Sequence, residues 1–305
     1  MALSGPGGSG TFASVSTARA SVKLLPLLAG EVAVDELRLS GLNAELVKYR
    51  DGRTNFDDLL APQGRTDARP AEKPPAPPGK EQQALTLDVG GISLKDANVR
   101  WLDETSGTDV RIGALDLRTD RIASGVPGRL AISASIEGAQ PKLALTLSAN
   151  AGYLVDFAKR SFALSALDVK LSGNVPGAAG LDAQLKGDVA VDGAAERVAL
   201  ADFVLRATSK DGLAANLAVP SLELSPQRAQ SKAIEGTLRI DRPERKLDAK
   251  LAVDAATLQD KAVAFPRLAV DVDLKQGALG VRGAMGGPAN VDLGAQRIAL
   301  PKVAG

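Results

Sequence analysis

The chain has 305 residues and a net charge of +1, from 37 Lys and Arg against 36 Asp and Glu. This balance disfavours a nucleic-acid-binding surface, which needs a basic surplus. The chain contains no cysteine and no histidine, which excludes disulfides, thiolate zinc sites and a Ser-His-Asp triad. No run of 18 or more apolar residues occurs, so we expect no membrane-spanning helix in the chain.

The first part of the chain divides into two segments. Residues 1–19 begin with a Gly-rich stretch, and we expect a flexible start there. Residues 20–60 alternate apolar and polar side chains in short runs, which is the period of half-buried strands. Gly30, Gly41 and the Asp51-Gly52 dipeptide punctuate the runs as turns. Thr54 or Asn55 is placed to cap one helical turn over residues 56–60.

The end of this unit carries a recognisable motif. Leu46 is followed at fixed spacing by Gly52, Asn55, Phe56, Asp58 and Leu59. The motif and the alternating runs before it resemble the AsmA-like family of bacterial envelope proteins, over about 45 residues. We expect the motif to be structural, with Asn55-Phe56 capping and stapling the turn that closes the first β unit. The family usually begins with an inner-membrane anchor helix, so we expect a fragment that lacks this anchor and also stops within its C-terminal repeats.

The next segment has a different composition. Residues 61–83 contain six prolines and no Val, Ile, Leu or aromatic residue. Such a stretch cannot bury apolar area to offset its ordering entropy, so it is a loop or linker. We weigh two interpretations of it, a spacer between strands and a docking peptide for a partner, and favour the spacer.

Residues 84–305 repeat one sequence pattern. Apolar residues alternate with polar ones in run after run, and turn chemistry such as Ser106-Gly107, Asp192-Gly193, Asp211-Gly212 and Gly286-Gly287-Pro288 lies between runs. We predict an all-β fold: an extended, curved antiparallel sheet of consecutive hairpins, groove-like or sandwich-like, with at most one or two short helices. Residues 153–159 and 255–264 are the helix candidates, and we interpret both as hairpin corners.

The predicted strands place their large apolar side chains on one face. We expect this face to contact lipid, and the candidate lipid-facing residues are Leu130, Ile132, Ile136, Leu143, Leu145, Leu147, Leu268, Val270, Val272 and Leu274. A smooth aliphatic lining of Leu, Val and Ala suits acyl chains, which need apolar area rather than precise polar partners. Trp101 is interpreted as a core or edge aromatic.

No catalytic or ligand-binding motif competes with this interpretation. The carboxylates follow the pattern of solvated strand faces and turns, and we expect no enzyme activity, cofactor or metal. The family resemblance implies a periplasmic cell-envelope protein on the inner-membrane side. Its expected role is in outer-membrane biogenesis, carrying phospholipid or regulating protein targeting to the outer membrane. The alternative is a scaffold whose closed β core binds envelope proteins; an adhesin and an enzyme rank below it.

Overall fold

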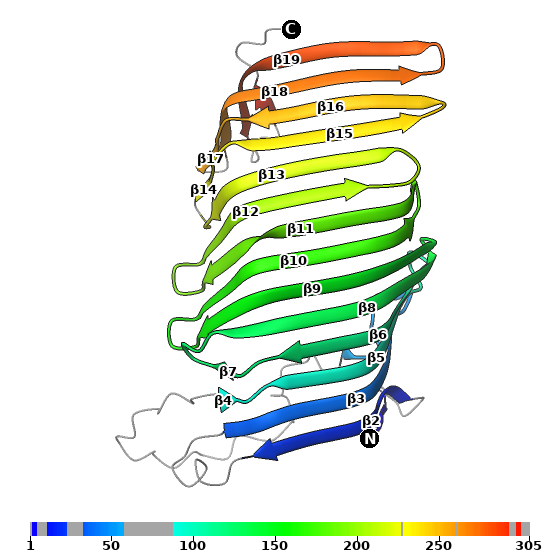
Figure 1. Cartoon of the computed structure of the whole chain (residues 1–305), viewed down its shortest axis with the longest axis vertical. Coiled ribbons are helices and arrows are strands. Elements are labelled where there is room, and N and C mark those ends of the chain that lie inside the picture. The colour runs from blue at the N-terminus through cyan, green and yellow to red at the C-terminus, as the bar shows by residue number, and fades with distance from the viewer. Residues whose placement is uncertain are drawn as a thin grey trace.

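The protein forms one sheet. The computed structural model describes residues 2–4, 11–22, 33–57, 88–226, 228–259, 262–292 and 297–299. Within these ranges twenty strands belong to a single sheet and no helical element occurs. Figure 1 shows the long strands lying side by side, from β2 (blue, bottom) to β19 (orange-red, top). The predicted all-β fold of consecutive hairpins is therefore confirmed.

Fourteen long strands carry the sheet, in the spatial order β2, β3, β5, β6, β8, β9, β10, β11, β12, β13, β15, β16, β18 and β19. Their bounds are Thr11–Val22, Ala33–Lys48, Ile92–Asp103, Thr108–Thr119, Gly128–Gln140, Leu143–Asp156, Ser161–Val175, Ala178–Asp192, Arg197–Thr208, Leu213–Leu224, Ile234–Arg242, Arg245–Val253, Ala262–Gln276 and Leu279–Asp292. Short strands extend the ladder locally: β1 (Ala2–Ser4), β4 (Asp88–Val89), β7 (Ile122–Ala123), β14 (Arg228–Ser231), β17 (Ala256–Gln259) and β20 (Arg297–Ala299).

One pairing departs from the antiparallel rule. Strand β3 pairs in parallel with β4 and β5, with Leu37 opposite Ile92 and Leu46 opposite Trp101. The prediction of a purely antiparallel sheet is wrong at this point. After β3 the chain turns back and forms only an isolated antiparallel bridge, between Lys48 and Thr54. It then reaches β5 through a long connection. Connections of this length permit a parallel neighbour, whereas a tight hairpin does not.

Several local expectations also change. The runs expected as separate strands between residues 32 and 46 are one strand, β3, which passes through Gly41 with a φ of +60°. Residues 2–4 and 11–19, which lie in the segment expected as a flexible start, belong to strands β1 and β2. Gly286-Gly287-Pro288 lies inside β19 rather than in a turn. Residues 153–159 and the described part of 255–264 are strand ends and turns, as expected of hairpin corners.

β-Bulges inside several strands keep the apolar residues of those strands on the same face of the sheet. Asp96, Ala114 and Ala166 have positive φ values of 51°, 47° and 50° inside strands. The backbone N–H of each donates to a side chain of the neighbouring strand: Asp96 to Asp116 at 2.8 Å, Ala114 to Asn98 at 3.4 Å and Ala166 to Asp188 at 2.7 Å. An extra residue at a bulge shifts the alternation by one position. Apolar residues on both sides of each bulge, such as Leu164 and Leu167, therefore stay on one face.

The sheet has little interior. No large side chain of the described residues is fully buried, and most of the buried apolar residues are alanines, together with Tyr153 and Val253. Tyr153 is held by its hydroxyl, which donates to the carbonyl oxygens of Asp120 at 2.8 Å and Arg121 at 3.0 Å. Among the described residues these observations indicate a single layer, and the described strands form no second sheet of a sandwich on either face.

Candidate functional site

An unbroken row of apolar residues crosses the whole sheet. Following the cross-strand register from β2 to β19, each of the fourteen long strands contributes one residue and none of these residues is polar. The row is Ala18, Leu39, Leu94, Leu117, Ile132, Ala149, Val169, Leu185, Leu205, Leu217, Gly236, Leu251, Val270 and Met285. At roughly 4.8 Å between neighbouring strands, the row is about 60 Å long.

We call the face that carries this row the apolar face, and the opposite one the polar face. The ten residues expected to face lipid all lie on the apolar face, because register places them in the row or in rows parallel to it. For example, Leu145 lies opposite Ile136, and Leu274 lies opposite Leu247. All ten are half-buried, and two other residues of the row, Leu217 and Leu251, are each 37% exposed. Strand neighbours shield these side chains laterally, and the described residues put no layer over them.

The polar face carries the charges. Ion pairs cross it between neighbouring strands, for example Lys186 with Asp168 at 3.9 Å and Arg239 with Asp248 at 3.7 Å. Exposed pairs of this kind contribute at most about 1 kcal/mol each. Their main effect is to give the two faces opposite solvent preferences, since one face is well hydrated and the other is not.

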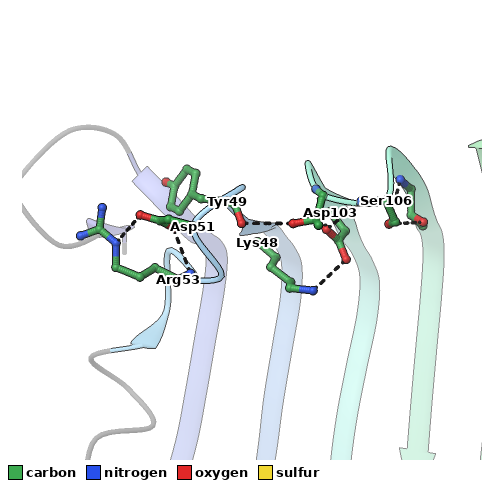
Figure 2. A network of polar contacts seen from close by, with 8 residues as sticks. Lys48, Tyr49, Asp51, Arg53, Asp103 and Ser106 are labelled. Carbon is green, nitrogen blue, oxygen red and sulfur yellow. Dashed lines mark hydrogen bonds and ion pairs between the residues drawn. The ribbon is translucent and has the colours of Figure 1, made fainter.

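The apolar face ends in a charged pair beside the turn that carries Gly52, Asn55 and Phe56 of the motif. Beyond Leu46 and Trp101, the next residues on the same face are Lys48 and Asp103, whose Nζ and Oδ2 atoms are 3.1 Å apart. Figure 2 shows this pair beside Tyr49 and the Asp51–Arg53 contact of the turn. The ring of Phe56 lies 6.4 Å from that of Trp101, centroid to centroid, at an angle of 53°. The interpretation of Trp101 as an edge or core aromatic omitted this contact, which joins two residues far apart in the sequence.

Asn55 acts as a substitute strand for the end of β3. Its side-chain Oδ1 accepts from the Val47 N–H at 2.9 Å, and its Nδ2 donates to the Glu45 carbonyl at 2.7 Å. Its own backbone N–H donates to the Val47 carbonyl at 3.0 Å. A primary amide presents one acceptor and two donors, so it can replace a neighbouring peptide group. Asn55 thus satisfies backbone groups where β2 no longer pairs with β3.

The turn is closed by two hydrogen bonds that Thr54 donates to the carboxylate of Asp57. The Thr54 hydroxyl donates to Asp57 Oδ1 at 2.5 Å, and the Thr54 N–H donates to Asp57 Oδ2 at 2.9 Å. Gly52 has a φ of +85°, which glycine adopts without strain. Gly52, Asn55 and Phe56 of the motif thus make structural contacts at this turn, with Asn55 bonded to the end of β3 rather than acting as a helix cap. Asp58 and Leu59 lie outside the described residues.

We expect acid to destabilise the folded protein by protonating carboxylates such as those of Asp57 and Asp211. Hydrogen bonds from the side chain and then the backbone of Thr54 hold the pKa of Asp57 below its ordinary value of 3.8, and Ser209 does the same for the pKa of Asp211. A carboxylate whose pKa is lowered by folding stabilises the folded state at pH values above its ordinary pKa. This stability is lost as the pH falls through the folded-state pKa. Since the chain has no histidine, we expect a flat melting temperature from about pH 8 to 5. The melting temperature should then fall at pH values below 3.8, the ordinary pKa of an aspartate side chain.

Thermal melting followed by circular dichroism from neutral to acid pH measures this dependence. The Asp57→Asn variant should show a shallower fall in acid than the parent protein. A decline in melting temperature already between about pH 7 and 5.5 would contradict the assignment, because the depressed carboxylates of the described residues titrate below that range.

A hollow on the polar face is a feature that sequence reasoning missed. It has a volume of about 580 Å³ and lies over β2, β3, β5, β6 and β8, next to the bulges at Asp96 and Ala114. The charged residues that line it are Glu45, Arg100, Arg111 and Glu137. Arg100 donates to both carboxylate oxygens of Asp109 at 2.9 Å and to Glu45 at 2.8 Å. The lining charges cancel, so the hollow lacks the positive potential that an anionic ligand needs.

The described residues offer no reactive constellation. They contain no group of three or more acidic side chains arranged to hold a metal ion, and they leave no buried side-chain polar atom without a partner. Within the same ranges we find no helix with the length and hydropathy that a membrane span requires. The feature that stands out is therefore the apolar face itself.

Fold and site together define a class: a single-layer β protein with one continuous apolar face and one charged face. Comparison with protein-family models identifies the family, because the model of the AsmA family matches residues 1–278. The chain belongs to the AsmA family, and this membership is consistent with a role in the cell envelope and in outer-membrane biogenesis. No curated protein and no solved structure matches the chain.

Proposed function

We propose that this chain is a non-enzymatic envelope protein that carries the acyl chains of phospholipids along its apolar face. The observation that carries the proposal is the apolar row, which crosses fourteen strands without a polar residue. The proposal includes the periplasmic side of the inner membrane as the location, which is an expectation drawn from the family.

Physical chemistry supports a lipid occupant. Monomeric soluble proteins rarely expose continuous apolar patches larger than a few hundred Å², so a face of this length calls for a cover. An acyl chain gains about 0.8 kcal/mol for each CH₂ group that leaves water. It needs no directional partner, and the side chains of the apolar row offer none. A phospholipid lying with its tails on the row keeps its headgroup at the rim of the sheet, in water.

The alternative of a closed β core gains no support from the fold. A closed core requires a second layer, and the described strands form a single sheet. Association with other envelope proteins remains compatible with the edges of the sheet, but no described side-chain arrangement on the apolar face favours a protein over a lipid.

Lipid analysis of the purified protein tests the proposal. We expect phospholipid to co-purify with the folded chain, as measured by solvent extraction and mass spectrometry. The Leu251→Lys variant places an ammonium group in the middle of the row, and burying it under an acyl chain is unfavourable. We expect the bound lipid per protein to fall about tenfold in this variant, for a cost of about 1.4 kcal/mol per tenfold step.

The matched control is Ala252→Lys, the next residue of β16. Ala252 is exposed and lies on the polar face, opposite Glu235 and Ala269. We expect its lipid content to equal that of the parent protein. Absence of phospholipid from a monodisperse folded parent, or equal loss in both lysine variants, would overturn the proposal.

A further inference from the structure

Two pairs of charged residues lie on the apolar face, both at the same long rim of the sheet. This rim is on the side of the turns between β5 and β6 and between β15 and β16, where Lys48 lies opposite Asp103 and Arg242 lies opposite Arg245. Between these pairs the rim also contains apolar strand ends such as Leu143. Figure 1 shows the turn between β15 and β16 on the right side of the sheet. We call this rim, with its two charged pairs, the charged rim.

The opposite rim of the same face is apolar up to the ends of its strands. At this rim, on the left in Figure 1, the last apolar-face residues of β9 to β13 are Val155, Phe162, Val191, Val198 and Leu224. Each lies opposite the next in the cross-strand register. Phe162 is 38% exposed and Leu224 is 40% exposed, so apolar surface reaches solvent here. We call these five residues the apolar rim.

The two arginines of the charged rim differ in their partners. Arg242 and Arg245 lie opposite each other at the end of the β15–β16 hairpin, one apolar-face position beyond Ile240 and Leu247. Arg242 donates to the Asp211 carboxylate at 2.9 Å and to the Asp211 carbonyl at 3.0 Å. Arg245 is exposed, and its guanidinium has no ion-pair or hydrogen-bond partner among the described residues. Like charges directly opposite each other repel, so this hairpin end favours one more anion beside Arg245.

The neighbours of Arg245 leave room for such an anion. On its other side Arg245 lies opposite Gln276 of β18, whose side-chain amide can donate a further hydrogen bond. Glu244, in the turn, is exposed and forms no ion pair with either arginine. Lys246, the next residue and on the polar face, is paired with Asp241 at 3.2 Å. A guanidinium and an amide at the end of an apolar strand face suit the phosphate end of a lipid whose tails lie on that face.

We propose that the phosphate group of a phospholipid binds Arg245, and that its acyl tails lie along the strands toward the apolar rim. The inference rests on the proposed lipid carriage and gives the bound lipid a direction. A guanidinium donates two parallel hydrogen bonds to phosphate oxygens. Val253 ends β16 eight residues after Arg245, or about 27 Å away, whereas a tail is about 15 Å long, half the hydrocarbon thickness of a bilayer. The tails therefore fit on the apolar residues of this strand, among them Leu247 and Leu251.

Tryptophan fluorescence can measure this direction, because the chain has a single tryptophan. Bromine atoms on a lipid tail quench an indole ring only at close range. Trp101→Phe removes the native signal, and a second substitution in that variant places a reporter on β16. Leu247→Trp lies two residues from Arg245 and Leu251→Trp lies six residues from it, on the same face of the strand. Circular dichroism melts of both reporter variants check that they stay folded.

We expect phosphatidylglycerol brominated beside its ester groups to quench the Leu247→Trp reporter more than lipid brominated at its methyl ends. The order should reverse for the Leu251→Trp reporter. Adding Arg245→Gln to the Leu247→Trp reporter should raise the lipid concentration at half-maximal quenching about threefold, through the loss of one exposed ionic contact. The matched control Lys250→Gln removes a charge from the polar face of the same strand and should leave that concentration unchanged.

The same order of quenching at both reporters, or the reverse of the expected order, would overturn the proposed direction. An unchanged half-maximal concentration in Arg245→Gln, or an equal change in Lys250→Gln, would overturn the phosphate contact. If neither lipid quenches either reporter in the folded protein, the proposed lipid carriage fails and this inference fails with it. The failure of the inference alone is therefore distinct from the failure of the proposed function.

Discussion

Replacing Gly173 by alanine should lower the free energy of unfolding by about 3 kcal/mol. Gly173 lies in β10 with a φ of +140°, a conformation that residues with a side chain rarely adopt. An added Cβ would lie 2.0 Å from the Ala144 carbonyl oxygen and 2.9 Å from the Leu145 Cα. Both atoms belong to the backbone of β9, so the two strands would have to separate. Urea denaturation followed by circular dichroism measures the change.

Gly177→Ala is the matched control for this prediction. Gly177 lies in the turn that follows β10, with a φ of +78°, and its added Cβ would meet no atom within 4 Å. Only the cost of the left-handed backbone remains, about 1 kcal/mol. If the two alanine variants are equally stable, the close approach of β9 to Gly173 is not what requires glycine there.

Replacing Asn55 by alanine should lower the free energy of unfolding by about 2 kcal/mol. The variant loses the two side-chain hydrogen bonds that satisfy the Val47 N–H and the Glu45 carbonyl. Both backbone groups lie at the end of β3, where the neighbouring strand β2 no longer pairs with it. The expected loss therefore combines two hydrogen bonds with incomplete replacement by water at a partly buried position.

Two further variants separate this role from a general preference for asparagine. Asn55→Asp keeps an acceptor for Val47 but loses the donor to Glu45, so it should fall between the parent and Asn55→Ala. Asn43→Ala removes only a local contact, a 3.2 Å hydrogen bond to the Gly41 carbonyl, and should cost less than about 1 kcal/mol. A loss in Asn43→Ala as large as in Asn55→Ala would refute the substitute-strand role.

The alternation of apolar and polar residues was enough to predict the fold class and the composition of the apolar face. In a strand the side chains alternate strictly, so the pattern in β8 or β9 fixes which residues share a face. All ten predicted residues accordingly lie on the apolar face. Whether lipid contacts them stays a prediction, which the lysine variants test.

Strand direction and long-range contacts could not be inferred in the same way. The parallel pairing of β3 with β5 follows a long connection, of which residues 61–83 contain no strand pattern that could indicate strand direction. The contact between Phe56 and Trp101 depends on that same pairing. Gly286-Gly287-Pro288 has turn composition, yet it lies in a strand because β18 supplies the partners for residues 286 and 287. In each case tertiary pairing overrides the local preference.

The positions of the bulges are indicated in the sequence by polar residues inside strands, which the search for alternating apolar residues passed over. Asp188, Asn98 and Asp116 are polar residues inside strands, and each accepts a hydrogen bond from a bulged residue one strand away. Asp and Asn are depleted from strand interiors. Their presence there, together with a shift in parity, marks a bulge and could be searched for in other chains of this kind.

The single layer has a consequence for how such a protein changes in size. Each added hairpin lengthens the sheet by roughly 10 Å, twice the interstrand spacing, and leaves the remaining strands in their own pairings. A compact globule would need to repack its centre after such an insertion, whereas this architecture has almost no centre to disturb. Whole hairpins can therefore be gained or lost as modules, and the span of the molecule can be matched to a distance in steps of one hairpin.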